Sequence, residues 1–211
     1  MEKQKSYFLV PKLFSKFPVT YYFLMICIIL SCLNIFLPVH RWLAISGNSI
    51  AHGEYYLFFT HIVGHRDFTH LFGNLLYLIV LMPFLESKLK PKNMFMVILI
   101  GTVLEGVLLI VFNKPNVGTV GASGLVYIFF GMYIILAKYM MDKIYFILLS
   151  IFVGISLAPP VIAKFVGLFS ETLAGTIANP DISVVGHLSG LGIGLVLGLL
   201  YLPKLRNKSR T

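Results

Sequence analysis

The sequence predicts an all-α polytopic membrane protein, a bundle of six transmembrane helices with the N- and C-termini both cytoplasmic. Composition gives the first indication, because 58% of the 211 residues are hydrophobic and only 12% are charged. The mean hydropathy of +0.89 is the second. Both values are typical of membrane spans rather than of soluble domains. The third is the placement of Lys and Arg, which gather in alternate loops between the apolar stretches.

The spans follow from the uncharged stretches, since a helix needs about 20 mostly apolar residues to cross the hydrocarbon core. Six such stretches form a single membrane domain over residues 1–211, without a separate soluble domain or an internal repeat. Short basic tails, 1–16 and 203–211, flank them. The predicted spans are 17–38, 68–86, 93–112, 119–137, 144–160 and 183–202.

The first apolar stretch is interpreted as a retained span. It is too long for the apolar region of a signal peptide, and no small-residue cleavage site follows it. Cys27 and Cys32 both lie in it and are interpreted as packing or lipid-facing residues. The connection 39–67 is too long for a simple turn, and its apolar, aromatic part 55–64 is too short to span. We expect that part to lie in the outer membrane interface.

Orientation follows from the loops, because Lys and Arg concentrate on the cytoplasmic side of membrane proteins. With the N-terminus inside, 13 of the 17 Lys and Arg residues fall inside, and only Arg41, Arg66, Lys114 and Lys164 fall outside. The net charge of +9 then faces anionic lipid headgroups. The expected partner is therefore the lipid bilayer of the cell membrane, which the chain crosses several times, and nucleic acid is not expected.

Four polar residues stand out, because polar groups within a bilayer are costly. His70 and Asn74 begin the second span, Ser123 begins the fourth and His187 begins the sixth. These three spans run in the same direction, so all four side chains lie within about 10 Å of the outer boundary. Each residue alone has an ordinary structural explanation, such as a serine bonded to its own helix or an interfacial histidine. Their coincidence at one depth predicts a functional site.

Glycines surround the two most reactive of these residues. Ser123 stands between Gly121 and Gly124, which allow a bend that exposes the hydroxyl. In the sixth span His187 is followed by Gly190 and Gly194, with glycines at intervals of four that let two helices approach closely. Packing of spans four and six along these faces brings His187 to Ser123. Tyr127, one turn after Ser123, could then stack on the imidazole.

Serine is a poor nucleophile until a base removes its proton, and histidine is the usual base at neutral pH. No Asp or Glu lies at the same depth to orient the imidazole, so the residues predict a Ser123–His187 dyad rather than a triad. Attack on a carbonyl creates an oxyanion, which needs hydrogen-bond donors. The candidates are the Ser123 backbone N–H, the Asn74 amide and the His70 ring.

These motifs together resemble the rhomboid family of intramembrane serine proteases. The Gly-x-Ser-Gly signature is residues 121–124, and the second-span pattern of two histidines and an asparagine is similar to His65, His70 and Asn74. The His-x-x-Gly-x-x-x-Gly signature looks like His187, Gly190 and Gly194. Tyr127 matches the residue that packs on the family's catalytic histidine, and Glu86 resembles the acidic residue that often ends the second span. The resemblance runs from about residue 53 to 198.

The resemblance implies a rhomboid-like serine endopeptidase with Ser123 and His187 as catalytic residues, an oxyanion site at His70 and Asn74, and neither metal nor cofactor. Substrates would be single-span membrane proteins with small residues at the cut. Segment 161–182 with the fifth span would form a lateral gate, and 39–67 a membrane-embedded first loop.

Three positions depart from the family pattern. Leu57 replaces the arginine of the first-loop motif, which weakens the expectation that this loop is anchored in the usual way. Gly186 replaces the more usual alanine before the catalytic histidine. Glu105 in the third span is unusual and is interpreted as a protonated or paired packing residue.

Two other functions fit parts of the sequence. A catalytically silent rhomboid-like protein would bind membrane clients, but such relatives typically lose the serine or the histidine, and this chain keeps both. A small transporter would spread polar residues through the bilayer depth, and only Glu105 fits that pattern. A metalloprotease is not supported, because His65 and His70 do not form an HExxH motif.

Overall fold

The computed structural model describes residues 16–137 and 183–208, with the single residues 147, 151 and 154 between them. This part of the chain is helical and contains no strand, which agrees with the predicted all-α class; one isolated antiparallel bridge joins Ile45 and Thr119. The predicted fifth span, 144–160, lies outside the described residues apart from those three positions. The connection 161–182 and most of both predicted tails also lie outside them.

Five apolar helices form the body of the described chain. They are α2 (Pro18–Leu33), α6 (Phe68–Leu89), α7 (Pro91–Phe112), α8 (Ser123–Leu136) and α11 (Val184–Lys208). Three of them, α6, α7 and α11, are long and apolar enough to cross a membrane. With 16 and 14 residues, α2 and α8 are shorter than the predicted spans 17–38 and 119–137. The chain is thus an integral membrane protein.

Two side chains account for the position of α2. Asn34 follows its last residue and turns the chain away: its amide donates to the carbonyls of His65 and Arg66, and its oxygen accepts from the His40 N–H. At the other end Glu86 of α6, which is 1% exposed, accepts from the N–H groups of Val19 and Thr20 at 2.9 and 2.8 Å. A carboxylate at a helix N-terminus satisfies free N–H groups and the helix dipole. Glu86 therefore fixes α2 against α6.

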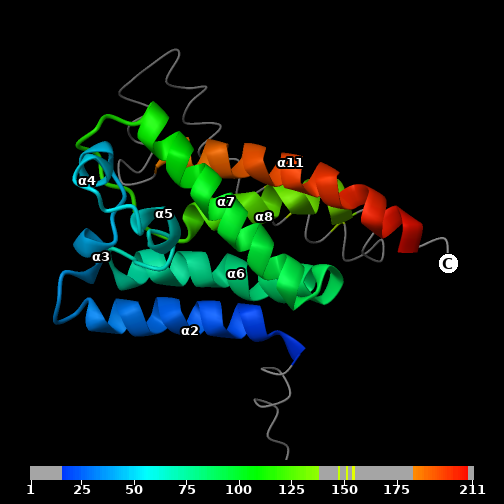
Figure 1. Ribbon diagram of the computed structural model, residues 1–211. Helices are drawn as coiled ribbons and strands as arrows, with labels where there is room; N and C mark the ends of the chain where they lie inside the picture. The colour runs from blue at the N-terminus through cyan, green and yellow to red at the C-terminus, as the bar shows by residue number, and fades with distance from the viewer. Residues whose placement is uncertain (1–15, 138–146, 148–150, 152–153, 155–182, 209–211) are drawn as a thin grey trace, which may run out of the picture.

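The helix that carries the predicted nucleophile lies in the middle of the bundle. Every residue of α8 from Gly124 to Tyr133 is buried. Figure 1 shows α8 between α6 and α11, behind the diagonal α7. Figure 1 also shows that α6, α8 and α11 begin at the same end of the molecule and run in the same direction. This common direction places the first turns of the three helices together.

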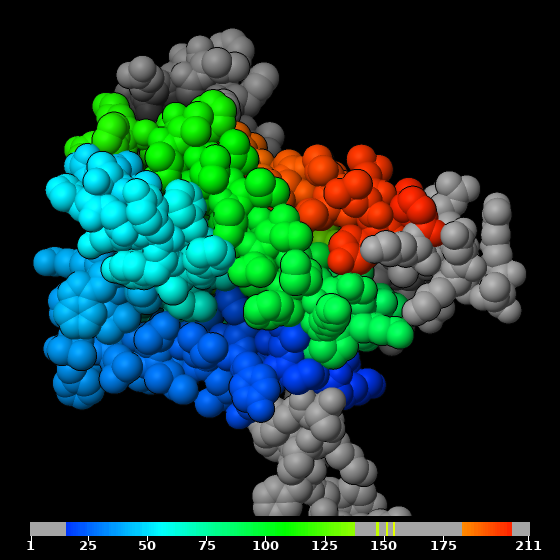
Figure 2. Space-filling view, viewed as in Figure 1, coloured from blue at the N-terminus to red at the C-terminus, as the bar shows by residue number. Residues whose placement is uncertain are grey.

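The connection 39–67 covers that end of the bundle and contains three short helices, α3 (Val39–Trp42), α4 (Gly47–Ala51) and α5 (Leu57–Thr60). In Figure 2 it forms a continuous surface between α2 and α7. Leu57 is fully buried and packs in one cluster with Ile45 and Leu109. The sequence left the usual anchoring of this loop in doubt at Leu57, and here burial of an apolar side chain attaches the loop instead.

Candidate active site

Ser123 is the first residue of α8, and the non-helical segment immediately before it explains why the helix begins there. The Thr119 N–H and carbonyl pair with Ile45. Gly121 then adopts a φ of 129°, which only glycine adopts readily. Its N–H donates to the His61 carbonyl at 2.8 Å. Because these contacts hold 119–122 out of the helix, the Ser123 N–H belongs to the first turn, where backbone N–H groups have no partner within the helix.

The segment before Ser123 also rests on a buried histidine. The Ala122 N–H points to Nε2 of His65 at 3.4 Å. Burial, and to a lesser degree the neighbouring His70 ring, lower the pKa of His65 to about 4. His65 is therefore neutral near pH 7, and Nε2 can keep the lone pair that accepts this hydrogen bond. The rings of His65 and His70 meet edge to face, with centroids 5.2 Å apart.

Glycines bring α8 and α11 into backbone contact. A Cβ at Gly190 would overlap the Gly124 carbonyl, and one at Gly194 would overlap the backbone of Ile128. On the facing helix a Cβ at Gly131 would overlap the backbone of α11 near Leu191. The close packing predicted from the glycine spacing is thus present, and it sets the first turn of α11 beside that of α8.

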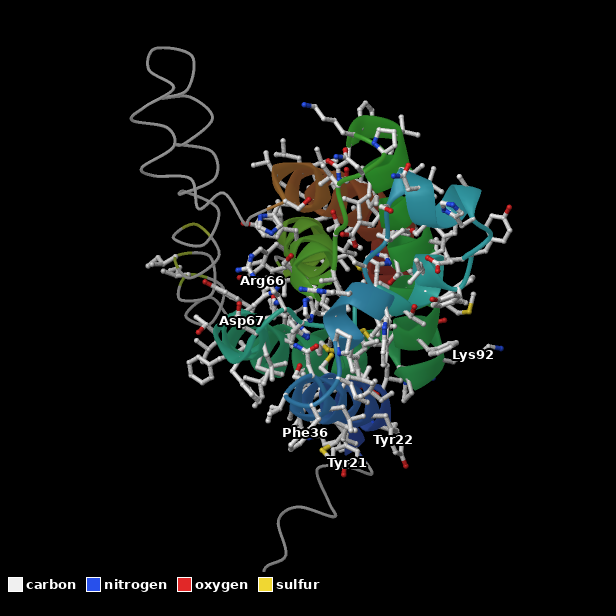
Figure 3. All side chains as sticks on the ribbon, turned by 90° about the vertical axis from the view of Figure 1, so that its left-hand side faces the viewer. Tyr21, Tyr22, Phe36, Arg66, Asp67 and Lys92 are labelled. Atoms are coloured by element: carbon white, nitrogen blue, oxygen red, sulfur yellow. The ribbon has the colours of Figure 1, made fainter. Side chains whose placement is uncertain are left out.

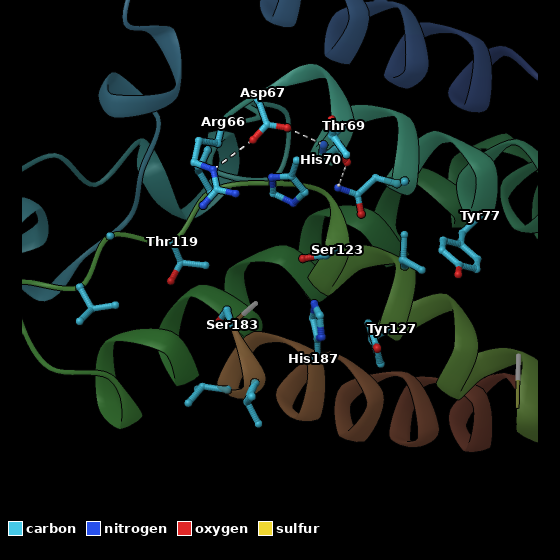
Figure 4. A pocket seen from close by; sticks show the side chains of 18 of the residues that line it. Arg66, Asp67, Thr69, His70, Tyr77, Thr119, Ser123, Tyr127, Ser183 and His187 are labelled. Atoms are coloured by element: carbon cyan, nitrogen blue, oxygen red, sulfur yellow. Dashed lines mark hydrogen bonds and ion pairs between the residues drawn. The ribbon is translucent and has the colours of Figure 1, made fainter. Parts of the chain in front are cut away.

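His187 lies in this first turn of α11 and is 9% exposed. Its ring stacks on Tyr127 with centroids 4.1 Å apart and planes inclined by 13°. In Figure 4 His187 and Ser123 line the same pocket, and a ring nitrogen of His187 points toward Ser123. Nδ1 is buried and has no hydrogen-bond partner among the described residues.

His70 and Asn74 reach the same pocket from α6. Gly121 lies against the His70 ring so closely that a Cβ there would overlap it. Asn74 is 6% exposed, and its amide donates one hydrogen bond to the His70 carbonyl at 3.0 Å. Since a primary amide has two N–H groups, the second remains to donate to a ligand. The structure thus brings together the four polar residues singled out in the sequence.

The pocket has a volume of about 870 Å³ and opens at the N-terminal ends of α6, α8 and α11. Arg66 and Asp67 stand at its rim, joined by an ion pair of 3.1 Å (Figure 3). Asp67 also caps α6 by accepting from the His70 N–H, and this hydrogen bond is the main reason why the pKa of Asp67 is lowered. Among the described residues no group of three or more His, Cys, Asp or Glu could hold a metal ion.

Two residues beside the site were missed or undervalued in the sequence. The His61 carbonyl accepts a hydrogen bond from the segment before Ser123. The sequence indicated His61 only as a histidine within the apolar stretch 55–64. Glu105 was interpreted as a paired packing residue, and it does face His61, with 3.8 Å between Oε2 and Nε2. Its contact with Gly124 could not be inferred from sequence spacing.

Comparison with known proteins decides the family. A family model described as the Rhomboid domain matches residues 52–204, which is most of the chain. The chain belongs to the rhomboid family. It is also similar to a Bacillus subtilis (strain 168) protein named "Putative rhomboid protease YdcA", with 27% identity over 156 residues that cover 74% of this chain and 71% of that one. The predicted membership of the rhomboid family is thus confirmed, and the Gly-x-Ser-Gly and histidine motifs of this rhomboid all fall within the matched region.

Proposed function

We propose that this chain is an intramembrane serine endopeptidase that cuts transmembrane segments near the outer face of the bilayer. The observation that carries the proposal is the placement of Ser123 and His187 in one pocket, across the glycine contact of α8 and α11. Substrates would be single-span proteins of the cell membrane. Both termini of the enzyme would be cytoplasmic, in line with the distribution of Lys and Arg.

In the proposed reaction Ser123 Oγ attacks the carbonyl carbon of the peptide bond while its proton passes to His187 Nε2. The oxyanion accepts hydrogen bonds from the Ser123 N–H and the Asn74 amide, with the His70 ring as a third candidate. His187 then gives the proton to the leaving amine, and the C–N bond breaks. Water attacks the acyl-enzyme, with His187 again as base, and Ser123 regains its proton as the carboxylate product leaves.

The stack of His187 on Tyr127 replaces part of what an acidic third residue does in a triad. An orienting carboxylate holds the imidazole in one position and one tautomer. Here the imidazole stacks on the Tyr127 ring, with the two planes inclined by 13°. This contact with a side chain of α8 restricts both rotation and translation of the imidazole. The arrangement supports a dyad of Ser123 and His187.

A fluorophosphonate probe tests the proposal directly, because it reacts only with a serine that a neighbouring base activates. We expect the folded protein in detergent to be labelled at Ser123, as identified by mass spectrometry of the modified peptide, and heat-denatured protein to remain unlabelled. Folded protein that stays unlabelled would instead fit a silent, client-binding member of the family.

Replacing Asn74 by Ala is expected to slow cleavage of a single-span reporter without abolishing it. Loss of one oxyanion donor typically lowers kcat by about 10²–10³-fold. The matched control is Asn93→Ala, because Asn93 in the first turn of α7 also donates to the carbonyl four residues earlier, that of Leu89 at the end of α6, at 2.8 Å. The Asn93 variant should cleave at the normal rate. Equal cleavage rates for the two variants would show that Asn74 does not donate to the oxyanion.

A further inference from the structure

A buried acid and a buried base meet behind the candidate active site. His61 lies at the end of α5 and is 0% exposed, and Glu105 lies in α7 and is 2% exposed. His61 Nε2 and Glu105 Oε2 face each other at 3.8 Å, and neither atom has a hydrogen-bond partner among the described residues. Charged or polar groups are rarely buried in this way unless they are paired.

A hydrogen bond of the histidine fixes the orientation of its ring. His61 Nδ1 lies 2.8 Å from the Leu57 carbonyl oxygen. A carbonyl can only accept, so Nδ1 must carry a hydrogen. Nε2, the other ring nitrogen, is therefore the atom that faces Glu105.

The pair contacts the nucleophile motif on both sides of Ser123. On one side, the His61 carbonyl accepts the hydrogen bond from the Gly121 N–H. On the other side, the Glu105 carboxylate fills the space beside Gly124, where a Cβ would overlap it. The same carboxylate lies beside Gly186, where a Cβ would be 3.4 Å from Oε1. Glu105 thus touches the residue after Ser123 and the residue before His187.

We propose that Glu105, held by His61, is a positioning residue that sets the placement of Ser123 relative to His187. The inference rests on the proposed function, since it concerns the reactivity of the same serine. Glu105 contacts neither reacting group and acts through the backbone at Gly124 and Gly186. Two elements far from each other in sequence, the first loop and α7, are thereby tied to the two helices that carry the dyad.

The test compares two substitutions of nearly equal size. In Glu105→Gln the amide keeps a polar group of the same size facing His61 Nε2. In Glu105→Leu the space beside Gly124 stays filled, but Nε2 then faces an apolar group. The readouts are the rate of fluorophosphonate labelling at Ser123, kcat and KM on a single-span reporter, and Tm.

We expect Glu105→Leu to lower the labelling rate and kcat by at least about tenfold with little change in KM, because small misplacements of reacting groups are costly. Glu105→Gln should stay within about threefold of the wild type in both. Thr102→Val is the matched control: Thr102 is buried one turn earlier in α7 and bonds only its own helix, at the Ile98 carbonyl, in the described structure. It should lower Tm at most and leave the labelling rate unchanged.

The outcomes separate this inference from the proposed function. An unlabelled wild-type protein would contradict the proposed function. A labelled wild type with Glu105→Leu labelled just as fast would overturn only the positioning role, whatever the Tm. Glu105→Gln as slow as Glu105→Leu would overturn the role of the polar contact between residue 105 and His61. If Glu105→Leu fails to fold, His61→Leu/Glu105→Leu removes both polar groups together and avoids an unpaired one; slow labelling of that variant would support the inference, and normal labelling would refute it.

Discussion

Ser123→Ala is expected to abolish cleavage of a single-span reporter while the protein remains folded. The substitution removes one oxygen atom from the first turn of α8 and leaves the glycine contact with α11 and the ring stack on Tyr127 in place. Loss of the nucleophile of a serine protease typically lowers kcat by about 10⁶-fold, which is below detection in a gel assay. The measurement is product formation by the purified variant in liposomes, with Tm recorded in parallel.

The control for this prediction is Ser31→Ala, which removes the same atom from a buried serine of α2. Ser31 does not line the pocket, so this variant should cleave at the normal rate. Reporter cleavage that persists in Ser123→Ala, at a rate similar to that of Ser31→Ala, would rule out Ser123 as the nucleophile. The assignment of α8 as the catalytic helix would then have to be abandoned.

His187→Ala is expected to abolish both cleavage and probe labelling, because Ser123 would lose the base that accepts its proton. In serine proteases removal of the base alone costs about as much as removal of the nucleophile, of the order of 10⁶-fold in kcat. Loss of the imidazole also leaves a space beside Tyr127, so Tm is expected to fall by a few degrees. Labelling of Ser123 is measured by mass spectrometry.

The control variant for the base is His52→Ala. His52 is an exposed histidine of the first loop, and its Nδ1 lies 2.7 Å from the Asn48 carbonyl oxygen. This variant should label and cleave normally. If His187→Ala still reacted with the probe at the wild-type rate, another group would have to activate Ser123. His70 would be the first candidate, since its ring lines the same pocket.

The sequence predicts best the helices whose first residues include a capping side chain or a proline. Asp67 caps α6 at its start, and Pro91 occupies the first turn of α7, so both begin close to the predicted positions. The start of α8 was placed too early, because residues 119–122 are uncharged but are held out of the helix by contacts with Ile45 and His61. The end of α2 was placed too late for a similar reason, since Asn34 bonds to residues of the next connection.

For the candidate site, the sequence could indicate which residues meet but not what supports them. Repeated glycines predicted the approach of α8 and α11, and with it the shared pocket of Ser123 and His187. His61 and Glu105 gave no comparable pattern, because their contacts join segments far apart in the chain. At Leu57 the family pattern showed only that an arginine is missing, and it could not show that an apolar side chain attaches the loop instead.

The backbone contact between α8 and α11 would limit how the proposed enzyme can evolve. The two backbones are in direct contact at Gly124 and Gly190. No side chain lies between them there whose size could change the distance from Ser123 to His187 in small steps. Natural variation in turnover would then have to arise elsewhere, in the pocket walls or in the contacts behind the motif. Selection could then alter which substrates fit, how quickly they enter, or the contacts of Glu105 behind the motif, while the approach of the two helix backbones is preserved.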